Sequence, residues 1–455
     1  MASQACYITG VGLTPFIKPS NDVDYPELAL SAGTKALLDA QLNYDAVEAG
    51  IACYCYGDST CGQRAFYQFG MTGIPILNVN NNCSTGSTGL YLGRNMITSG
   101  QADVVMVLGF EKMSPGALKS GWDDRASPIG LIARKMVEQR GWGEGPMTAQ
   151  MFGNAGREYM EKYGADERDF AEIARVNHMH SVQNPYAQFR KEYTLQEVME
   201  SPMLHSPITK LQACPTSSGA AAAILVSKRW LDQHGEMKEK AVQIAGQALT
   251  TDSPSTYEGS AMSLVGYDMT KLAAKRAMTE AGIKPDDVGV CELHDCFSAN
   301  ELVTLPALGL CDEDKAHEMV RNGDITHGGR IVVNPSGGLI SKGHPLGATG
   351  IAQAAEIVWQ LRGWANNRLV KGTKAGLQHI LGLGGACVVG VYRRADGEAN
   401  GVAEDTVIAR ASGLGHNPAT SSCKPTSEQV DQVRSRKARS EYALKDAREK
   451  RHAKL

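Results

Sequence analysis

The chain has 455 residues and a formal net charge of −3, and 42% of its residues are hydrophobic and 21% charged. This length leaves room for two or three domains with an ample core. The nearly balanced charge argues against a general nucleic-acid binder. No apolar run reaches the length of a membrane span, and the N-terminus lacks the basic-then-apolar pattern of a signal peptide.

Strands and helices alternate along the first part of the chain. Apolar runs at residues 5–12, 46–56 and 101–109 predict strands, and residues 25–40 have helical periodicity. This alternation predicts a parallel or mixed α/β sheet. A further apolar run at residues 217–227 predicts the strand that completes this half.

A segment of different composition lies between the predicted strands at 101–109 and 217–227. Residues 119–209 are richer in Met, Arg, Glu and Tyr, with helical patterns at 148–163 and 167–181. We interpret 119–209 as an inserted, mostly helical domain.

Cys83 stands at a turn between two apolar segments. Residues 74–79 predict a short buried strand, and residues 86–96 predict a buried helix rich in small side chains. A cysteine at the start of a helix faces unpaired N–H groups and the positive end of the helix dipole, which favour the thiolate that a nucleophile needs. The alternative is a small buried cysteine that fills a tight turn.

The cysteines as a set indicate free thiols. Their number, 11, is odd, and their spacing is not that of a disulfide framework, which is typical of a reducing compartment. Cys53 and Cys55 are one residue apart and do not form a Cys-x-x-Cys redox pair. Cys291, His294 and Cys296 carry zinc-binding donors, but no fourth ligand follows at a suitable spacing, so we expect no metal site.

The second half of the sequence repeats the first. Residues 35–47 match residues 276–288, and the Leu-Gly pair at 108–109 matches the pair at 381–382. Between them, Cys83 and the small residues after it match His344 and the small residues after it. Matches in the same order predict an internal duplication with two similar α/β halves around a pseudo-twofold axis. Cys83 and His344 are then expected to meet at the junction.

Three further motifs in the second half have candidate chemistry. They are Cys291-Glu-Leu-His-Asp-Cys-Phe297, Gly343-His-Pro-Leu-Gly-Ala-Thr-Gly350 and Leu381-Gly-Leu-Gly-Gly-Ala386. Taken singly, each has a structural alternative: His294 as a core histidine, His344 as a loop residue and the glycines as a turn. The glycines also let backbone N–H groups approach a bound carbonyl closely.

Together, the Asn80-Asn-Asn-Cys-Ser-Thr-Gly-Ser87 segment and these motifs resemble the thiolase superfamily over residues 5–395. The His294-Asp-Cys-Phe297 segment is similar to that of the sterol-carrier-protein thiolases. The cysteine that most thiolases carry in the last glycine motif is replaced by Gly382, and Cys296 is expected to take over its acid/base role.

The resemblance implies a fold and a domain division. The fold class is α/β, with two duplicated halves in a five-layer αβαβα arrangement and an inserted helical loop domain. The expected segments are 1–118 with 210–235, 119–209, 236–395 and a polar tail at 396–455. The tail is expected to be too short and too polar for the lipid-transfer domain of the two-domain members. The basic stretch 434–454 favours a solvated tail or a surface helix.

The resemblance also implies an acyltransferase that cleaves 3-ketoacyl-CoA in fatty acid β-oxidation. Cys83 is the expected nucleophile, His344 its base, His294 an enolate stabiliser and Cys296 the second acid/base. The backbone N–H of Gly384 is expected to join that of Cys83 in an oxyanion hole. No cofactor is expected besides CoA as a co-substrate, and a homodimer is the expected assembly.

The last three residues, Ala453, Lys454 and Leu455, differ by one substitution from the Ser-Lys-Leu peroxisomal signal. They predict recognition by a peroxisomal import receptor. Three functional alternatives remain: a condensing enzyme that runs the reaction in the direction of synthesis, an acyl-CoA-binding protein without turnover, and a sterol or lipid carrier.

Overall fold

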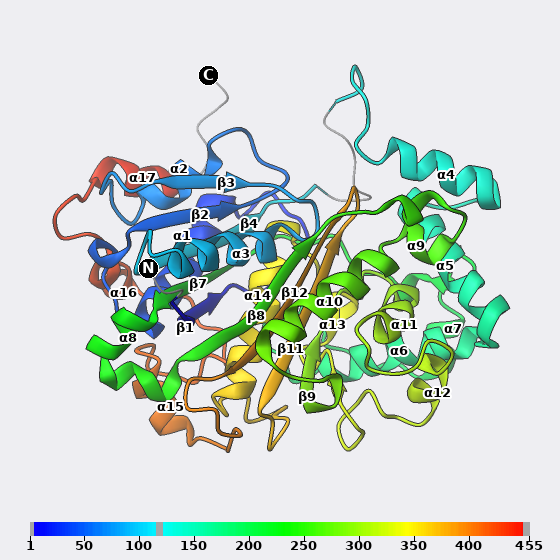
Figure 1. Ribbon diagram of the computed structural model, residues 1–455. Helices are drawn as coiled ribbons and strands as arrows, with labels where there is room; N and C mark the ends of the chain where they lie inside the picture. The colour runs from blue at the N-terminus through cyan, green and yellow to red at the C-terminus, as the bar shows by residue number, and fades with distance from the viewer. Residues whose placement is uncertain (1–3, 115–121, 449–455) are drawn as a thin grey trace.

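A computed structural model describes residues 4–114 and 122–448 (Figure 1). At its centre is a mixed ten-stranded sheet in the order β10-β9-β11-β12-β8-β1-β7-β4-β2-β3. The strands of the first half are β1 (Cys6–Leu13), β2 (Ala49–Cys53), β3 (Ile76–Val79), β4 (Val104–Glu111) and β7 (Gly219–Ser227). Those of the second half are β8 (Val242–Thr250), β9 (Val288–Glu292), β10 (Val332–Val333), β11 (Ala375–Gly382) and β12 (Ala386–Arg394).

The strand order confirms the duplication. From the antiparallel contact of β1 with β8, the order outward is β1-β7-β4-β2-β3 in one half and β8-β12-β11-β9-β10 in the other. Numbered within each half, both series run first, fifth, fourth, second, third. The central strands are fully buried runs of Val, Ile, Leu and Ala, which suit a sheet covered on both faces.

Helices cover the two halves in equivalent ways. Helix α1 (Tyr25–Asp39) packs on β1, β4 and β7, and its counterpart α10 (Tyr267–Ala281) packs on β8 and β12. Helices α3 (Thr85–Thr98) and α14 (Leu346–Leu361) pack against each other and contact strands of both halves. They form the shared middle layer near the centre of Figure 1. The two halves of the sheet form separate layers on either side of α3 and α14, and α1 and α10 cover their other faces. The layers thus follow the predicted αβαβα order, and the fold class is confirmed.

The inserted segment lies beside the second half of the sheet. Its described part contains α4 (Gly130–Arg140), α5 (Met147–Tyr163), α6 (Glu167–Ser181) and α7 (Leu195–Met199), with the small hairpin β5 (Met203–His205) and β6 (Ile208–Thr209). Helices α5 and α6 pack against α11 (Ser298–Ala307), and α6 also contacts α13 (Gly338–Lys342). The insertion therefore supports loops of the second half. The two halves also contain the helices α2 (Cys61–Tyr67), α8 (Lys228–Gln233), α9 (Ala261–Leu264) and α12 (Ala316–Arg321).

One predicted strand has a different environment from the one expected. The apolar run at 74–79 was expected to be buried, but β3 is the edge strand of the sheet, and Leu77 is 44% exposed. Within the described chain β3 pairs only with β2, so its outer edge has no strand beside it. Hydrophobicity alone did not distinguish an edge strand from a central one.

The C-terminal part folds back onto the first half. It contains α15 (Asp405–Ala411), α16 (Ser427–Val433) and α17 (Glu441–Arg448), and α16 packs against α1. Arg434 was expected in a solvated tail or a surface helix, but its side chain is 0% exposed. Its Nε donates to the carbonyl oxygen of Gln68 at 2.9 Å. Arg434 thus ties this C-terminal part to the first half, and the tripeptide 453–455, predicted to be a targeting signal, lies outside the described residues.

Within the residues that the structure describes, no helix combines the length and the apolar character needed to cross a bilayer.

We expect Arg434→Met to lower the melting temperature by several degrees. The substitution removes charge-assisted hydrogen bonds to the carbonyl oxygens of Gln68 and Ser440 and leaves buried acceptors unpaired, at a cost of about 2–4 kcal/mol. Thermal unfolding of the purified protein measures the shift. The exposed Arg436 offers the matched control, Arg436→Met. Equal melting temperatures for both variants would contradict a structural role for Arg434.

Candidate active site

Cys83 lies in a constrained turn directly before α3. Asn82, the preceding residue, has a left-handed backbone with φ of 53°, which asparagine tolerates better than most side chains. Its Nδ2 donates to the carbonyl oxygen of Leu383 at 2.9 Å, and the hydroxyl of Ser84 donates to the carbonyl oxygen of Asn81 at 2.8 Å. These contacts fix the thiol of Cys83 at the junction of the two halves, where it is 7% exposed.

His344 lies at the equivalent place before α14. Its backbone N–H donates to the hydroxyl of Ser217 at 3.1 Å, which links it to the end of the first half. One turn later, the N–H of Gly347 donates to Oε2 of Glu111 at 2.9 Å. Glu111 also accepts from the N–H of Tyr56 at 2.7 Å. One buried carboxylate therefore joins β4, the loop after β2 and the start of α14.

The helix starts themselves are in backbone contact. A Cβ on Gly86 would lie 2.9 Å from the carbonyl oxygen of Gly347, and a Cβ on Gly350 would collide with the backbone of Ser87. Glycine at these positions lets α3 and α14 approach more closely than other residues would.

The approach brings three reactive side chains together. The Sγ of Cys83 and a ring nitrogen of each of His294 and His344 lie within 4.8 Å of one another. The two imidazoles meet edge to face with centroids 5.4 Å apart. The Nε2 atoms of both histidines are buried without a hydrogen-bond partner in the protein. Buried polar atoms are normally paired, so these two nitrogens are available to a group that enters the site, such as a water molecule or a substrate.

His294 is held in a loop that two buried residues support. Asn334 accepts from the N–H of Leu293 at 2.9 Å. Asp295 accepts from the N–H groups of Leu339 and Ile340 at 2.6 and 3.1 Å, at the start of α13. This register leaves no room for a side chain on Gly338, whose φ is 57°. The loop of His294 and the loop of His344 are therefore fixed to each other.

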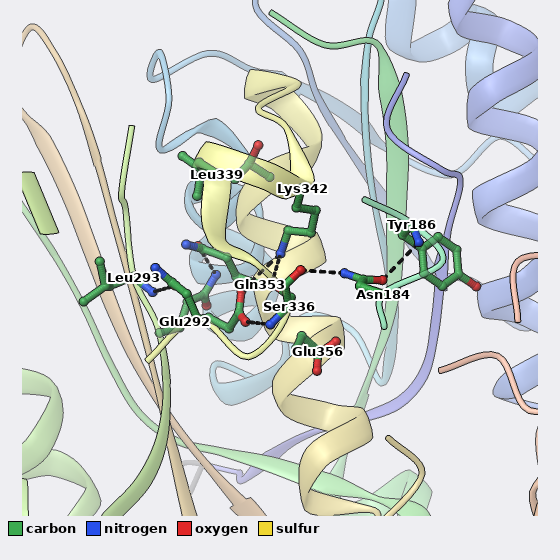
Figure 2. Close-up of polar contacts among 12 residues, drawn as sticks. Asn184, Tyr186, Glu292, Leu293, Ser336, Leu339, Lys342, Gln353 and Glu356 are labelled. Atoms are coloured by element: carbon green, nitrogen blue, oxygen red, sulfur yellow. Dashed lines mark hydrogen bonds and ion pairs between the residues drawn. The ribbon is translucent and has the colours of Figure 1, made fainter. Parts of the chain in front are cut away.

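A buried ion pair between Lys342 and Glu292 supports these loops. Lys342 donates to Oε2 of Glu292 at 3.1 Å and to the hydroxyl of Ser336 at 2.6 Å, as Figure 2 shows. Asn184 donates to the carbonyl oxygen of Ser336 at 2.8 Å, from the segment after α6. All four side chains are buried, so this network braces the segment that leads to His344.

Cys296 is buried next to a second thiol, that of Cys214. Its carbonyl oxygen accepts from the N–H of Cys214 at 2.9 Å. Burial, followed by the nearby thiols of Cys214 and Cys83, raises the pKa of Cys296 well above its usual value. Cys296 and Cys214 are therefore neighbours, and both lie near enough to Cys83 for its thiol to raise their pKa values beyond the effect of burial.

The glycine-rich turn between β11 and β12 faces the Cys83 loop. A Cβ on Gly382 would collide with the carbonyl oxygen of Asn81, so this position has no space for a cysteine. Gly384, with φ of 102°, follows in the same turn. The turn is held by the contact of Asn82 with Leu383 described above.

The structure brings some of the candidate residues together and leaves others apart. Cys83, His294 and His344 converge, with the turn of Gly384 adjacent. Cys296 lies outside this 4.8 Å group, although the Cys83 thiol is near enough to raise the pKa of Cys296. Cys291 does not belong to the group of donor side chains at the site. Sequence reasoning missed Glu111, Ser217 and Asp295, whose side chains accept hydrogen bonds from backbone N–H groups. The Asp inside the His-Asp-Cys-Phe segment was the one available signal.

Burial determines the resting charges of the site. It raises the pKa of the Cys83 thiol to about 12 and lowers the pKa of His344 to about 3. It also lowers the pKa of His294 well below its usual range, with the His344 charge as the next cause. These shifts favour a neutral thiol beside two neutral imidazoles. The helix-start effect was expected to favour thiolate, but loss of solvation outweighs it here.

Two models of known protein domains match most of the chain. The model of the thiolase N-terminal domain matches residues 6–229, and the thiolase C-terminal domain-like model matches residues 252–390. Sterol carrier protein 2 of Gallus gallus is 56% identical over 389 residues, covering 85% of this chain and 71% of that protein. The acetyl-CoA acetyltransferase of Methanothermobacter thermautotrophicus is 34% identical over 326 residues, covering 71% and 82%.

The chain belongs to the thiolase family. Human sterol carrier protein 2 matches with 53% identity over the same share of each chain as the Gallus protein, which agrees with the narrower resemblance to sterol-carrier-protein thiolases. Among solved structures, human mitochondrial 3-ketoacyl-CoA thiolase shares the fold with a TM-score of 0.64 and 18% identity, covering 86% of this chain and 99% of that one. The Ltp2-ChsH2(DUF35) aldolase has a TM-score of 0.70 and 23% identity, covering 85% and 97%. This thiolase is an acyltransferase with thiolase-type activity on acyl-CoA.

We expect alkylation of Cys83 by iodoacetamide to accelerate from pH 6 to 9 without levelling off. Because burial raises the pKa of this thiol to about 12, the reactive thiolate fraction grows about tenfold per pH unit over this range. Peptide mass spectrometry measures the rate at Cys83, with the exposed Cys423 as internal reference. A plateau below pH 8 would instead indicate a thiolate–imidazolium pair at rest.

Proposed function

We propose that this thiolase cleaves straight or 2-methyl-branched 3-ketoacyl-CoA, with CoA as the second substrate, to a shortened acyl-CoA and acetyl-CoA or propionyl-CoA. Two observations carry the proposal. Cys83 Sγ and a ring nitrogen of each of His294 and His344 lie within 4.8 Å of one another, and Nε2 of each histidine is buried without a partner in the protein. A thiol nucleophile, a base and an enolate stabiliser are what this cleavage requires.

In the first half-reaction, Cys83 would attack the 3-keto carbonyl while Nε2 of His344 accepts its proton. Collapse of the tetrahedral adduct breaks the C2–C3 bond and leaves the acyl group as a thioester on Cys83. The electrons of that bond pass into the enolate of acetyl-CoA or, with a 2-methyl group, propionyl-CoA. His294 would stabilise the enolate oxygen, with protonated His344 beside it. Cys296 would then protonate C2.

In the second half-reaction, Cys296 would take the thiol proton of incoming CoA. The CoA thiolate attacks the acyl-Cys83 thioester, the acyl-CoA leaves, and protonated His344 returns its proton to the Cys83 thiolate, which restores the thiol and the neutral imidazole. The N–H groups of Cys83 and Gly384 are the proposed donors to this tetrahedral oxyanion. Each proton and bond is accounted for by residues of this chain and CoA, so the proposed reaction calls for no further cofactor.

The comparisons support this choice of substrates. Two structural neighbours are human mitochondrial 3-ketoacyl-CoA thiolase, one of them in complex with CoA. A related protein bears the name acetyl-CoA acetyltransferase, which leaves the direction of synthesis as the second candidate. The exposed edge strand β3 supports a homodimer.

We expect the purified protein to convert both a straight and a 2-methyl-branched 3-ketoacyl-CoA, with CoA, to shortened acyl-CoA. Cys83→Ala is expected to abolish product and the acyl adduct, because the nucleophile is gone. Cys296→Ala is expected to form the adduct and to slow turnover by about 10²–10⁴-fold, because proton transfer is lost. Mass spectrometry follows products and adducts.

Two outcomes would contradict these assignments. Full turnover in Cys296→Ala would refute its acid/base role while leaving the cleavage intact. Acyl-CoA binding without any cleavage by the wild type would favour a binding protein.

We also propose that the protein is delivered to peroxisomes through Ala453, Lys454 and Leu455, which suits a part in fatty acid β-oxidation. The full chain with an N-terminal fluorescent tag is expected to co-localise with a peroxisomal membrane marker in cultured cells. Deletion of Leu455 is expected to disperse the signal, because the import receptor reads the terminal carboxylate and its side chains. Unchanged localisation after the deletion would refute the tripeptide as the signal.

A further inference from the structure

The proposed reaction makes opposite demands on the two histidines. His344 needs a lone pair on Nε2 to accept the Cys83 proton, and His294 needs a proton on Nε2 to donate to the enolate oxygen. Both rings are neutral at rest, so each holds a single proton on one of two nitrogens. The partner of the other nitrogen, Nδ1, decides where that proton sits.

Asn300 on α11 determines the tautomer of His294. Its Nδ2 donates to the carbonyl oxygen of His294 and lies 3.2 Å from Nδ1 of the same residue. A carbonyl oxygen only accepts, so this contact fixes which end of the Asn300 amide faces His294. Nδ1 therefore also receives a donor, and the ring proton must sit on Nε2. Nε2 is the buried nitrogen without a protein partner.

Thr349 on α14 determines the tautomer of His344 in the opposite sense. Its hydroxyl donates to the carbonyl oxygen of Pro345 at 2.9 Å and lies 2.8 Å from Nδ1 of His344. A hydroxyl has one proton, so its oxygen accepts the second contact. The ring proton of His344 is then on Nδ1, and Nε2 carries the lone pair.

We propose that Asn300 and Thr349 are positioning residues that hold His294 and His344 in opposite neutral tautomers, one as donor and one as base. This inference rests on the proposed function, because it assigns each tautomer a step of that reaction. Neither residue touches the reacting atoms; each acts through the imidazole that it binds.

The two half-reactions separate these roles. Acyl-enzyme formation from 3-ketoacyl-CoA produces an enolate and needs both histidines. Exchange of isotopically labelled CoA into a saturated acyl-CoA forms and breaks the Cys83 thioester without an enolate, so it needs His344 but not the donor function of His294. Rapid-quench mass spectrometry measures the first rate, and label incorporation measures the second.

We expect Asn300→Leu, a substitution of similar shape, to slow acyl-enzyme formation about tenfold and to leave CoA exchange within about twofold. Complete loss of an oxyanion donor costs about 10²–10³-fold, and here the donor is disoriented rather than removed. Thr349→Val is expected to slow both rates about tenfold or more, because a base in the wrong tautomer cannot accept the Cys83 proton. Thr349→Ser, which keeps the hydroxyl, is expected to restore both.

Asn184→Leu is the matched control. Asn184 also donates from a buried amide to a backbone carbonyl, that of Ser336, but it does not touch either histidine. Its variant is expected to lower the melting temperature while the ratio of the two rates stays as in the wild type. Equal slowing of both rates in Asn300→Leu would indicate structural damage and would overturn the role of Asn300.

Neutron diffraction of deuterated crystals shows which ring nitrogen of each histidine carries deuterium, independently of enzyme activity. Deuterium on Nε2 of His294 and on Nδ1 of His344 is the expected result, and the reverse placement at either ring would overturn the proposal for that residue. A wild type that carries the expected deuterons but cleaves no 3-ketoacyl-CoA would refute the proposed function alone.

Discussion

The close approach of α3 and α14 is the constraint on which the site depends. Cys83 and His344 each directly precede one of these helices, so the separation of the helix starts sets the separation of the two side chains. The approach is possible because glycine backbones meet at Gly86 and Gly350. A Cβ at either position would push against the other half of the molecule. The sheet and its outer layers serve to hold this contact in place.

Such a contact has an electrostatic consequence. Groups at the junction of two halves lose most of their water, and loss of water favours neutral forms of both acids and bases. The thiol of Cys83 and the ring of His344 therefore rest uncharged, although the start of α3 would stabilise a thiolate. Under these conditions the position of the single ring proton, rather than the net charge, decides which nitrogen of each histidine donates and which accepts. Neutral imidazoles must be directed by hydrogen bonds rather than by charge, which gives Asn300 and Thr349 their importance.

Much of this was predictable from the sequence, for physical reasons. The duplication was readable because equivalent elements keep equivalent patterns, and the repeat by itself predicts that Cys83 lies opposite His344. Contacts made by backbone groups were not readable. The links from Ser217 and Glu111 depend on which backbone N–H groups donate to these side chains. No pattern of side chains in the sequence identifies those donors. Burial of Arg434 was missed because a charged stretch resembles a solvated one until its carbonyl partners are known.

The identity of the chemistry depends on side chains rather than on the fold. The same fold, with a TM-score of 0.70, occurs in a protein described as an aldolase. In this chain the loop of Asn81 occupies the space that a side chain at Gly382 would need, so an acid/base thiol cannot stand there. Cys296, the proposed acid/base thiol, lies instead in the loop that carries His294. Because Asp295 binds that loop to the start of α13, a change in either loop moves the donor and the thiol together. The proposed roles of His294 and Cys296 are therefore coupled through one loop, whereas a thiol in the glycine turn would be independent of His294.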